Sequence, residues 1–287
     1  MKITQLRNAT VIIEASNRVI LLDPMLAPRG SIPALKYLTR SRRRNPLVEL
    51  PQETGALLER VTHCLITHCQ KGHFDHLDRA AVKWLREHQV PTICMQGDAD
   101  YLARKGLNVS ALKAKSEEQA FLRGTIVPIP CVHGQGLVGR MMAHGHGFFI
   151  QLPGEPSLYI AGDTVLTEDV KNCLTQRQPD VAVLPAGGAR FDLGGEIIMG
   201  EDDVIAASHL SSGVVVANHL EALDHCPVSR KELASLCQRE NLEGKLLIPA
   251  DGQTLTFAVA GRGCVDGIHQ PSPDVVESTP TREDHGV

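Results

Sequence analysis

The chain is poor in several features that would define its class at once. Aromatic residues make up only 3% of its 287 residues, so its hydrophobic share of 43% comes mainly from aliphatic side chains. No stretch reaches the roughly 18 apolar residues that cross a bilayer, so we expect no membrane span. Lys2 and Arg7 lie near the N-terminus, but no apolar segment typical of a secretory signal accompanies them. We therefore predict a cytoplasmic protein.

The chain also lacks an excess of positive charge. Its formal net charge is −4 and its sequence pI is about 6.3. Proteins that bind nucleic acid usually carry a clustered basic surface, so we expect no nucleic-acid partner and disfavour a nuclease. The basic run Arg40, Arg42, Arg43 and Arg44 is local, and is either a solvated loop or a contact for an anionic substrate or partner. We expect a small-molecule substrate as the partner, and a homo-oligomer stays open.

None of the eight cysteines forms a Cys-x-x-Cys pair. Without an export signal, reduced thiols are the better interpretation, some of them buried as small apolar groups. Cys69 and Cys226 lie close in sequence to several histidines, so a metal-ligand role for either is an alternative.

The pattern of apolar residues predicts strands first and alternating strands and helices later. Residues 1–25 contain three strand-like segments, and a hairpin turn is expected at Ala15, Ser16 and Asn17. The loop over residues 24–51 carries the signal for one short helix, at residues 34–39. A helix over residues 78–89 would begin at Asp78 as its N-cap.

We predict an α+β or α/β fold in one domain over residues 1–267. Residues 268–287 are rich in Pro, Ser, Thr, Glu and Asp, a composition typical of a disordered tail.

Histidine and aspartate are concentrated just after an apolar segment. Residues 67–76 read Thr-His-Cys-Gln-Lys-Gly-His-Phe-Asp-His, which places His68, His73, Asp75 and His76 within nine positions. Neutral imidazole nitrogen and carboxylate oxygen are the ligands that Zn²⁺, Fe²⁺ and Mn²⁺ accept. The segment therefore predicts a metal site.

Further residues of the same type follow other predicted strands. His68, His133, Asp163 and His219 each come directly after or shortly after an apolar segment. In α/β folds the ends of neighbouring strands build a site along one sheet edge, so we expect these side chains to meet.

These motifs resemble the metallo-β-lactamase superfamily. Its hallmark is Thr/Ser-His-x-His-x-Asp-His on a loop after a strand, followed by a distant His, a Gly-Asp-Thr or Gly-Asp-Ser, and a late His. Here the matching pieces are His73-Phe74-Asp75-His76 and Gly162-Asp163-Thr164. The N-terminal stretch Asn8-Ala9-Thr10-Val11-Ile12-Ile13-Glu14 is similar to the ascorbate-6-phosphate lactonase-like branch, and the resemblance covers roughly residues 1–260.

The resemblance implies a four-layer αββα sandwich with metals at the edge between two sheets. It also implies two divalent ions, Zn²⁺ first, with Mn²⁺ or Fe²⁺ allowed. One ion would be held by His68, His73 and His133, the other by Asp75, His76 and His219, and Asp163 would bridge them.

The implied activity is metal-dependent hydrolysis. A metal-bound hydroxide would attack the carbonyl of a lactone, ester or amide in a small, anionic or neutral substrate. Asp75 would orient the nucleophile or return a proton to the leaving group, which makes it the catalytic residue we name. Two alternatives stay open: a phosphodiesterase acting on a small or lipid-like phosphodiester, and a non-enzymatic metal or ligand sensor with a degenerate first site.

The chain departs from the family pattern at two places. Four residues separate His68 from His73 where the family has one, and strict spacing would put Lys71 at the first His. We expect Gly72 to let the loop bulge so that His68 still reaches, and otherwise Gln70 or Cys69 would substitute or the site would hold one metal. Asn8 stands where the branch usually has His, so no role is assigned to it.

Five further residues are candidates for contacts with the substrate or with the ligands. Asp23, at a strand end, either fixes a ligand imidazole or ends the strand before Pro24. Arg190 follows a Gly-rich segment and either faces an anionic oxygen or is an exposed turn residue. Glu221 and His225 support the site or form a local polar turn, and Lys71 completes this group.

Overall fold

The computed structural model describes residues 1–38, 42–70, 73–113, 117–134, 139, 142 and 145–259. Lys71 and the tail predicted over residues 268–287 lie outside these residues, so the expectations for both stay predictions.

Two seven-stranded sheets form the centre of the fold. In the first sheet the strand order is β14-β1-β2-β3-β4-β5-β6. Its strands are β1 (Lys2–Arg7), β2 (Thr10–Ala15), β3 (Arg18–Leu22), β4 (His63–Leu65), β5 (Pro91–Met95), β6 (Asn108–Leu112) and β14 (Thr254–Thr256). The strands β1 to β3 form an antiparallel meander, and β3 to β6 are parallel.

The second sheet has the order β13-β12-β11-β10-β9-β8-β7. Its strands are β7 (Gln119–Phe121), β8 (Gly124–Pro130), β9 (His146–Gln151), β10 (Leu158–Ile160), β11 (Val181–Pro185), β12 (Val214–Asn218) and β13 (Leu246–Leu247). The strands β7 to β10 are antiparallel neighbours, and β10 to β13 are parallel.

Aliphatic side chains fill the space between the sheets. Alternate residues of β2, such as Val11 and Ile13, point into one buried cluster with Ile150, Ile160 and Val183 of the second sheet. This alternation is what a strand with period two predicts when one of its faces is covered. The two sheets thus share one apolar layer built with few aromatic side chains.

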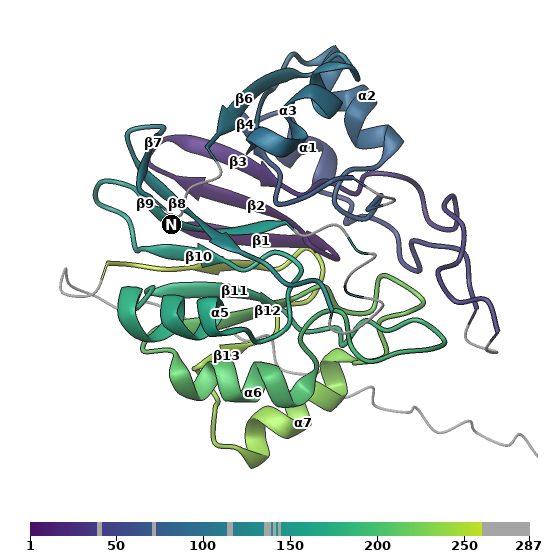
Figure 1. Cartoon of the computed structure of the whole chain (residues 1–287), viewed down its shortest axis with the longest axis vertical. Coiled ribbons are helices and arrows are strands. Elements are labelled where there is room, and N and C mark those ends of the chain that lie inside the picture. The colour runs from purple at the N-terminus through teal and green to yellow at the C-terminus, as the bar shows by residue number, and fades with distance from the viewer. Residues whose placement is uncertain are drawn as a thin grey trace, which may run out of the picture.

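Helices cover the two outer faces (Figure 1). The helices α2 (Arg79–Glu87) and α3 (Gln96–Ala103) bury Leu85 and Leu102 against Cys64 and Cys94 of the first sheet. The helices α5 (Glu168–Asn172), α6 (Glu201–Leu210) and α7 (Arg230–Arg239), with the π-helical turn Cys173–Arg177, cover the second sheet. The order helix, sheet, sheet, helix is the predicted αββα sandwich, which is confirmed.

Most predicted elements are present, with shifts at their ends. The helix expected over residues 78–89 is α2, and Asp78 caps it by accepting from the Ala81 N–H at 2.7 Å. The helix expected over residues 34–39 is wrong, because residues 34–38 contain only bends and irregular backbone. The short helix α1 (Thr54–Leu58) and the strands β6 and β7 were not predicted. Within the described part of the chain, no helix has the length and apolar character to cross a membrane.

Candidate metal centre

The first group of candidate ligands lies on the loop that follows β4. This strand is parallel to β3 and β5, so its carboxyl end opens at the same edge as theirs. The loop carries His68, His73, Asp75 and His76 and ends where Asp78 caps α2. Asp78 also accepts from the Ala27 N–H at 2.6 Å, which fixes the far end of the loop.

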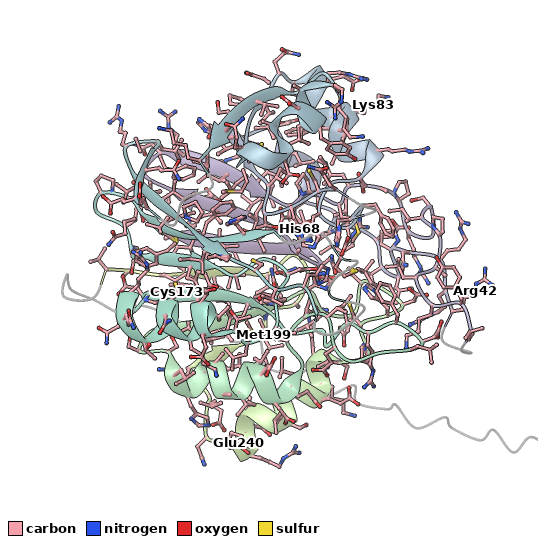
Figure 2. The ribbon with its side chains drawn as sticks, in the orientation of Figure 1. Arg42, His68, Lys83, Cys173, Met199 and Glu240 are labelled. Carbon is pink, nitrogen blue, oxygen red and sulfur yellow. The ribbon has the colours of Figure 1, made fainter. Side chains whose placement is uncertain are left out.

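The second sheet delivers three more candidates at the facing edge. His133, Asp163 and His219 follow β8, β10 and β12, which run in the same direction within this sheet. Gly162 has φ +65 and lies against the Thr67 side chain, so the turn before Asp163 brings the two sheets into close contact. In Figure 2 His68 lies near the middle of the molecule, between the two sets of helices.

The seven side chains meet in two adjoining groups. The group of His68, His73 and His133 has ligand atoms that lie within 4.8 Å of one another. The same limit holds for the second group, which consists of Asp75, His76, Asp163 and His219. All seven residues are buried.

Asp163 lies between the groups. Its Oδ2 atom is 3.1 Å from Nε2 of His76, 3.5 Å from Nε2 of His133 and of His219, and 4.0 Å from Nε2 of His68. One carboxylate oxygen therefore approaches imidazoles of both groups, as a bridging ligand would.

Each of the five imidazoles is held through its Nδ1 atom. The partner atoms are the Thr67 hydroxyl for His68, the Gln70 carbonyl for His73, the Asp23 carboxylate for His76, the Ile197 carbonyl for His133 and the Cys226 sulfur for His219. A partner at Nδ1 fixes the ring orientation and directs Nε2 into the centre, which is how proteins prepare metal-binding histidines.

The Nε2 atoms supply the test of whether these residues fit a metal. Those of His68 and His73 are buried and have no hydrogen-bond partner among the described residues, and that of His76 faces the Asp163 carboxylate at 3.1 Å. A buried polar atom without a partner costs free energy. A divalent cation accepts such lone pairs, so the residues present fit metal binding.

The two groups differ in their electrostatics. Burial, together with the neighbouring His76, lowers the pKa of His68 well below its ordinary value, and burial likewise lowers the pKa of His133. Burial would also lower the pKa of His76, but the Asp163, Asp75 and Asp23 carboxylates outweigh it and raise that pKa. Burial thus favours the neutral form of His68 and His133, whereas the second group contains the carboxylates Asp75 and Asp163.

The insertion between His68 and His73 does not displace His68 from the group. The ring centroids of His68 and His73 are 4.5 Å apart. The two substitutes considered for His68 point elsewhere: Gln70 donates to the Gly97 carbonyl and to Asp98, and Cys69 packs among apolar side chains behind the loop. The bulge expected at Gly72 itself lies outside the described residues.

Asp23 lies directly behind the centre. Its Oδ2 atom is 2.9 Å from Nδ1 of His76 and accepts from the Thr67 hydroxyl at 2.6 Å, while Oδ1 accepts from the Thr67 N–H at 2.8 Å. The carboxylate thus orients one imidazole and fixes the start of the histidine loop at the same time.

The remaining candidates are distributed more widely. His225 is buried beside the second group and stacks on Phe191 at 5.8 Å, and its Nδ1 has no hydrogen-bond partner within the described chain. Glu221 instead forms an ion pair with Arg230 at 2.7 Å, which ties its loop to α7. The Arg190 side chain is exposed. The nearby Gly188 N–H, a candidate donor to an anionic oxygen, donates instead to the Met199 carbonyl.

Sequence analysis missed two contacts in this centre. Cys226 lies 3.5 Å from Nδ1 of His219, so it contacts the ligand ring rather than the metal position. Asn8 lies on the other side of the same ring, with its carboxamide nitrogen 3.3 Å from Nε2 of His219. The position of Asn8 at the end of β1 was a usable signal, because Asp23 and His68 follow β3 and β4 at the same edge.

Comparison with known families agrees with this architecture. The family model described as "Metallo-beta-lactamase superfamily" matches residues 4–209, which is more than half of the chain. The chain belongs to the metallo-beta-lactamase superfamily. The ascorbate-6-phosphate lactonase-like branch stays a prediction, since this match is to the superfamily as a whole.

Several known proteins resemble this chain along most of its length. It is 31% identical to the UPF0173 protein YddR of Bacillus subtilis over 263 residues, which cover 90% of this chain and 100% of that protein. It is 27% identical to a UPF0173 metal-dependent hydrolase of Koribacter versatilis, over 65% of this chain and 72% of that one. These names agree with the expectation of a metal-dependent hydrolase.

Solved structures of the superfamily share the fold. The crystal structure of an isothiocyanate hydrolase from Delia radicum gut bacteria has a TM-score of 0.80 and 32% identity, and the match covers 90% of this chain and 100% of that one. A possible metal-dependent hydrolase from Veillonella parvula also has a TM-score of 0.80, at 27% identity, with 90% of this chain and 99% of that one covered.

Proposed function

We propose that this chain is a metal-dependent hydrolase that acts on an electrophilic carbon of a small molecule. The observation that carries the proposal is the pair of adjoining buried ligand groups, in which all five imidazoles are held at Nδ1 and so direct Nε2 toward the centre. His68, His73 and His133 would hold one cation, and Asp75, His76 and His219 the other, with Asp163 between them. Two such cations, with Zn²⁺ the first candidate and Mn²⁺ or Fe²⁺ the others, would lower the pKa of water toward neutrality and polarise the substrate.

The chain's own residues would orient the reactants and move the proton. Oδ2 of Asp75 lies 3.5 Å from Nε2 of His76 and 3.3 Å from Nε2 of His219. A carboxylate at this place can accept a proton from water and return it to a leaving group. Asp23 keeps the His76 ring fixed during this transfer.

One relative adds a further kind of electrophile to the candidate substrates. The isothiocyanate hydrolase from Delia radicum gut bacteria is 32% identical to this chain, and the match covers all of that hydrolase and 90% of this chain. Water added to the central carbon of R–N=C=S gives, after C–N cleavage, the amine R–NH₂ and carbonyl sulfide. That carbon is attacked as a carbonyl carbon is, so an isothiocyanate joins lactones, esters and amides as a substrate class for the same centre.

A cationic cleft beside the centre supports a substrate with a negative charge. The cleft has a volume of about 470 Å³, and His73 and Cys69 are among its lining residues. Four cationic residues also line it: Arg79, Lys83, Arg86 and Lys105. Its acidic member, Asp78, is already engaged with the N–H groups of Ala27 and Ala81. An anionic group on the substrate would find a favourable potential here.

Charge reversal in this cleft tests that part of the proposal. Arg79→Glu should raise KM about tenfold for a carboxylate-bearing substrate at low ionic strength, which is about 1.4 kcal/mol, and leave a neutral analogue unaffected. Arg79 is exposed at the first residue of α2, where an acidic side chain is compatible with the helix dipole, so the fold should be retained. Arg123→Glu, at the exposed turn between β7 and β8, is the matched control. Equal KM changes for both substrates would contradict an anion site.

The central experiment combines metal analysis with a substrate panel. Protein reconstituted with Zn²⁺, Mn²⁺ or Fe²⁺ is assayed with a lactone, an aryl ester, an aryl-alkyl isothiocyanate and bis(p-nitrophenyl) phosphate. We expect two cations per chain and turnover of at least one of the three carbon electrophiles. Turnover of the phosphodiester alone would favour phosphoryl chemistry, and one cation or none without turnover would favour a sensor.

A further inference from the structure

Asn8 occupies an unusual position at the turn between β1 and β2. It is fully buried, and its backbone has φ +55, in the left-handed region. Asparagine tolerates this region better than most residues with a side chain, yet a buried polar side chain still needs a partner. Its Oδ1 atom has none among the described residues.

The backbone holds Asn8 against His219. The His219 N–H donates to the Asn8 carbonyl at 2.9 Å, and the Gln5 side chain donates to the same oxygen at 2.8 Å. His219 itself has φ +59, so this hydrogen bond links two non-glycine residues that are both in left-handed conformations. Strain of this kind persists where the surrounding structure fixes it, and it concentrates at functional sites.

The side chain of Asn8 lies at ligand distance from its neighbours in the centre. Its carboxamide nitrogen is 3.3 Å from Nε2 of His219, the same separation as between that Nε2 and Oδ2 of Asp75. Two atoms bound to one cation at about 2.1 Å each lie roughly 3 to 3.4 Å apart. The carboxamide head of Asn8 therefore occupies the kind of position that a further ligand would occupy.

The chemistry of the amide decides which of its atoms would face a cation. The Nδ1 atom of His219 is engaged with Cys226, so its Nε2 is the atom directed into the centre. An NH₂ group beside a cation is repelled, whereas rotation about the Cβ–Cγ bond presents the carbonyl oxygen with almost the same shape. That rotation would also give the unpartnered Oδ1 an electrostatic partner.

We propose that the carboxamide oxygen of Asn8 is an additional ligand of the cation held by Asp75, His76, Asp163 and His219. This inference rests on the proposed function, because it assumes that the second group binds a metal. A neutral oxygen donor raises the coordination number and shifts the preference of this position toward cations such as Mn²⁺ and Fe²⁺.

Asn8→Gly removes the carboxamide and keeps the backbone conformation, since glycine adopts positive φ without strain. We expect it to weaken binding of one of the two cations at least tenfold in chelator competition, and to leave the other cation unchanged. In cobalt-substituted protein the visible absorption should become more intense, as it does when a five-coordinate cobalt ion becomes four-coordinate. Asn17→Gly is the control, because Asn17 has φ +60 in the next hairpin turn but is exposed.

A second variant keeps the test decisive. In Asn8→Asp the new aspartate also tolerates the left-handed backbone. This variant should bind the cation of the second ligand group more tightly, because a charged oxygen replaces a neutral one. Unchanged affinities and an unchanged cobalt spectrum in both variants would overturn the inference, and so would a rise in KM alone, which would point to a substrate contact. Wild-type protein that binds no metal would instead overturn the proposed function itself.

Discussion

Asp163→Asn should reduce kcat/KM by about a thousandfold or more and lower the metal content below two cations per chain. The Oδ2 atom of this residue approaches imidazoles of both ligand groups, between 3.1 and 4.0 Å from their Nε2 atoms. Asparagine keeps the shape but removes the charge that a bridging ligand supplies. A loss of about 4 kcal/mol of transition-state stabilisation corresponds to that factor. Steady-state kinetics and elemental analysis of the same preparation measure both effects.

The matched control for this substitution is Asp169→Asn, because Asp169 is an exposed carboxylate in the first turn of α5. It should retain wild-type activity and metal content. His76→Ala should abolish activity as Asp163→Asn does, since its Nε2 is directed to the same centre. Normal hydrolysis by either variant of the centre would show that the second group is not where the reaction occurs.

Removal of the metals should lower the melting temperature by about 10 to 20 °C. Each cation at about a hundredfold excess over its Kd stabilises the folded state by about 2.7 kcal/mol, so two contribute about 5 kcal/mol. For a chain of this size, 1 kcal/mol corresponds to about 2 to 4 °C. The effect is large because the ligands come from loops of both sheets, so the cations join the two halves of the sandwich.

Thermal scans of chelator-treated and reconstituted protein measure this shift. Asp163→Asn protein is the control, and chelation should lower its melting temperature by a smaller amount. Protein shown to be metal-free by elemental analysis, yet melting at the same temperature as the reconstituted form, would contradict a coupling of metal binding to stability.

The sandwich was predictable because strong local signals mark its main elements. The meander β1 to β3 follows from alternating apolar residues, and α2 from Asp78 and the spacing of Ala81 and Leu85. The strands β6 and β7 were missed because they lie at the sheet edges, where exposed residues such as Ser110 weaken the apolar pattern, and β7 has only three residues. The irregular segment after Met25 was partly assigned as helix because its tertiary anchors do not appear in the local sequence.

The seven clustered residues were all named from the sequence: four crowd into one segment, the others follow predicted strands, and the resemblance to the superfamily joined them into one ligand set. Their roles as metal ligands remain a proposal. The exact partners were less predictable: Glu221 pairs with Arg230, nine residues later, and not with the centre. No role was assigned to Asn8, because it stands where the related branch usually has histidine. Neither relation can be derived from spacing alone, since both depend on how distant turns pack.

Arg7 anchors the long segment between β3 and α1 through its main chain. This buried guanidinium donates to the carbonyls of Met25, Ala27 and Val48, at distances between 2.6 and 3.0 Å. It recognises only main-chain oxygen, so these three attachments do not depend on which side chains the segment bears. A further attachment does depend on one, because the buried Asn45 carboxamide donates to the Asp224 carboxylate at 3.0 Å and accepts from the Asp224 N–H at 2.9 Å. For protein engineering the segment is therefore a replaceable stretch in which exposed positions such as Arg29 and Arg42 can be varied while Asn45 and the attachments to Arg7 are kept.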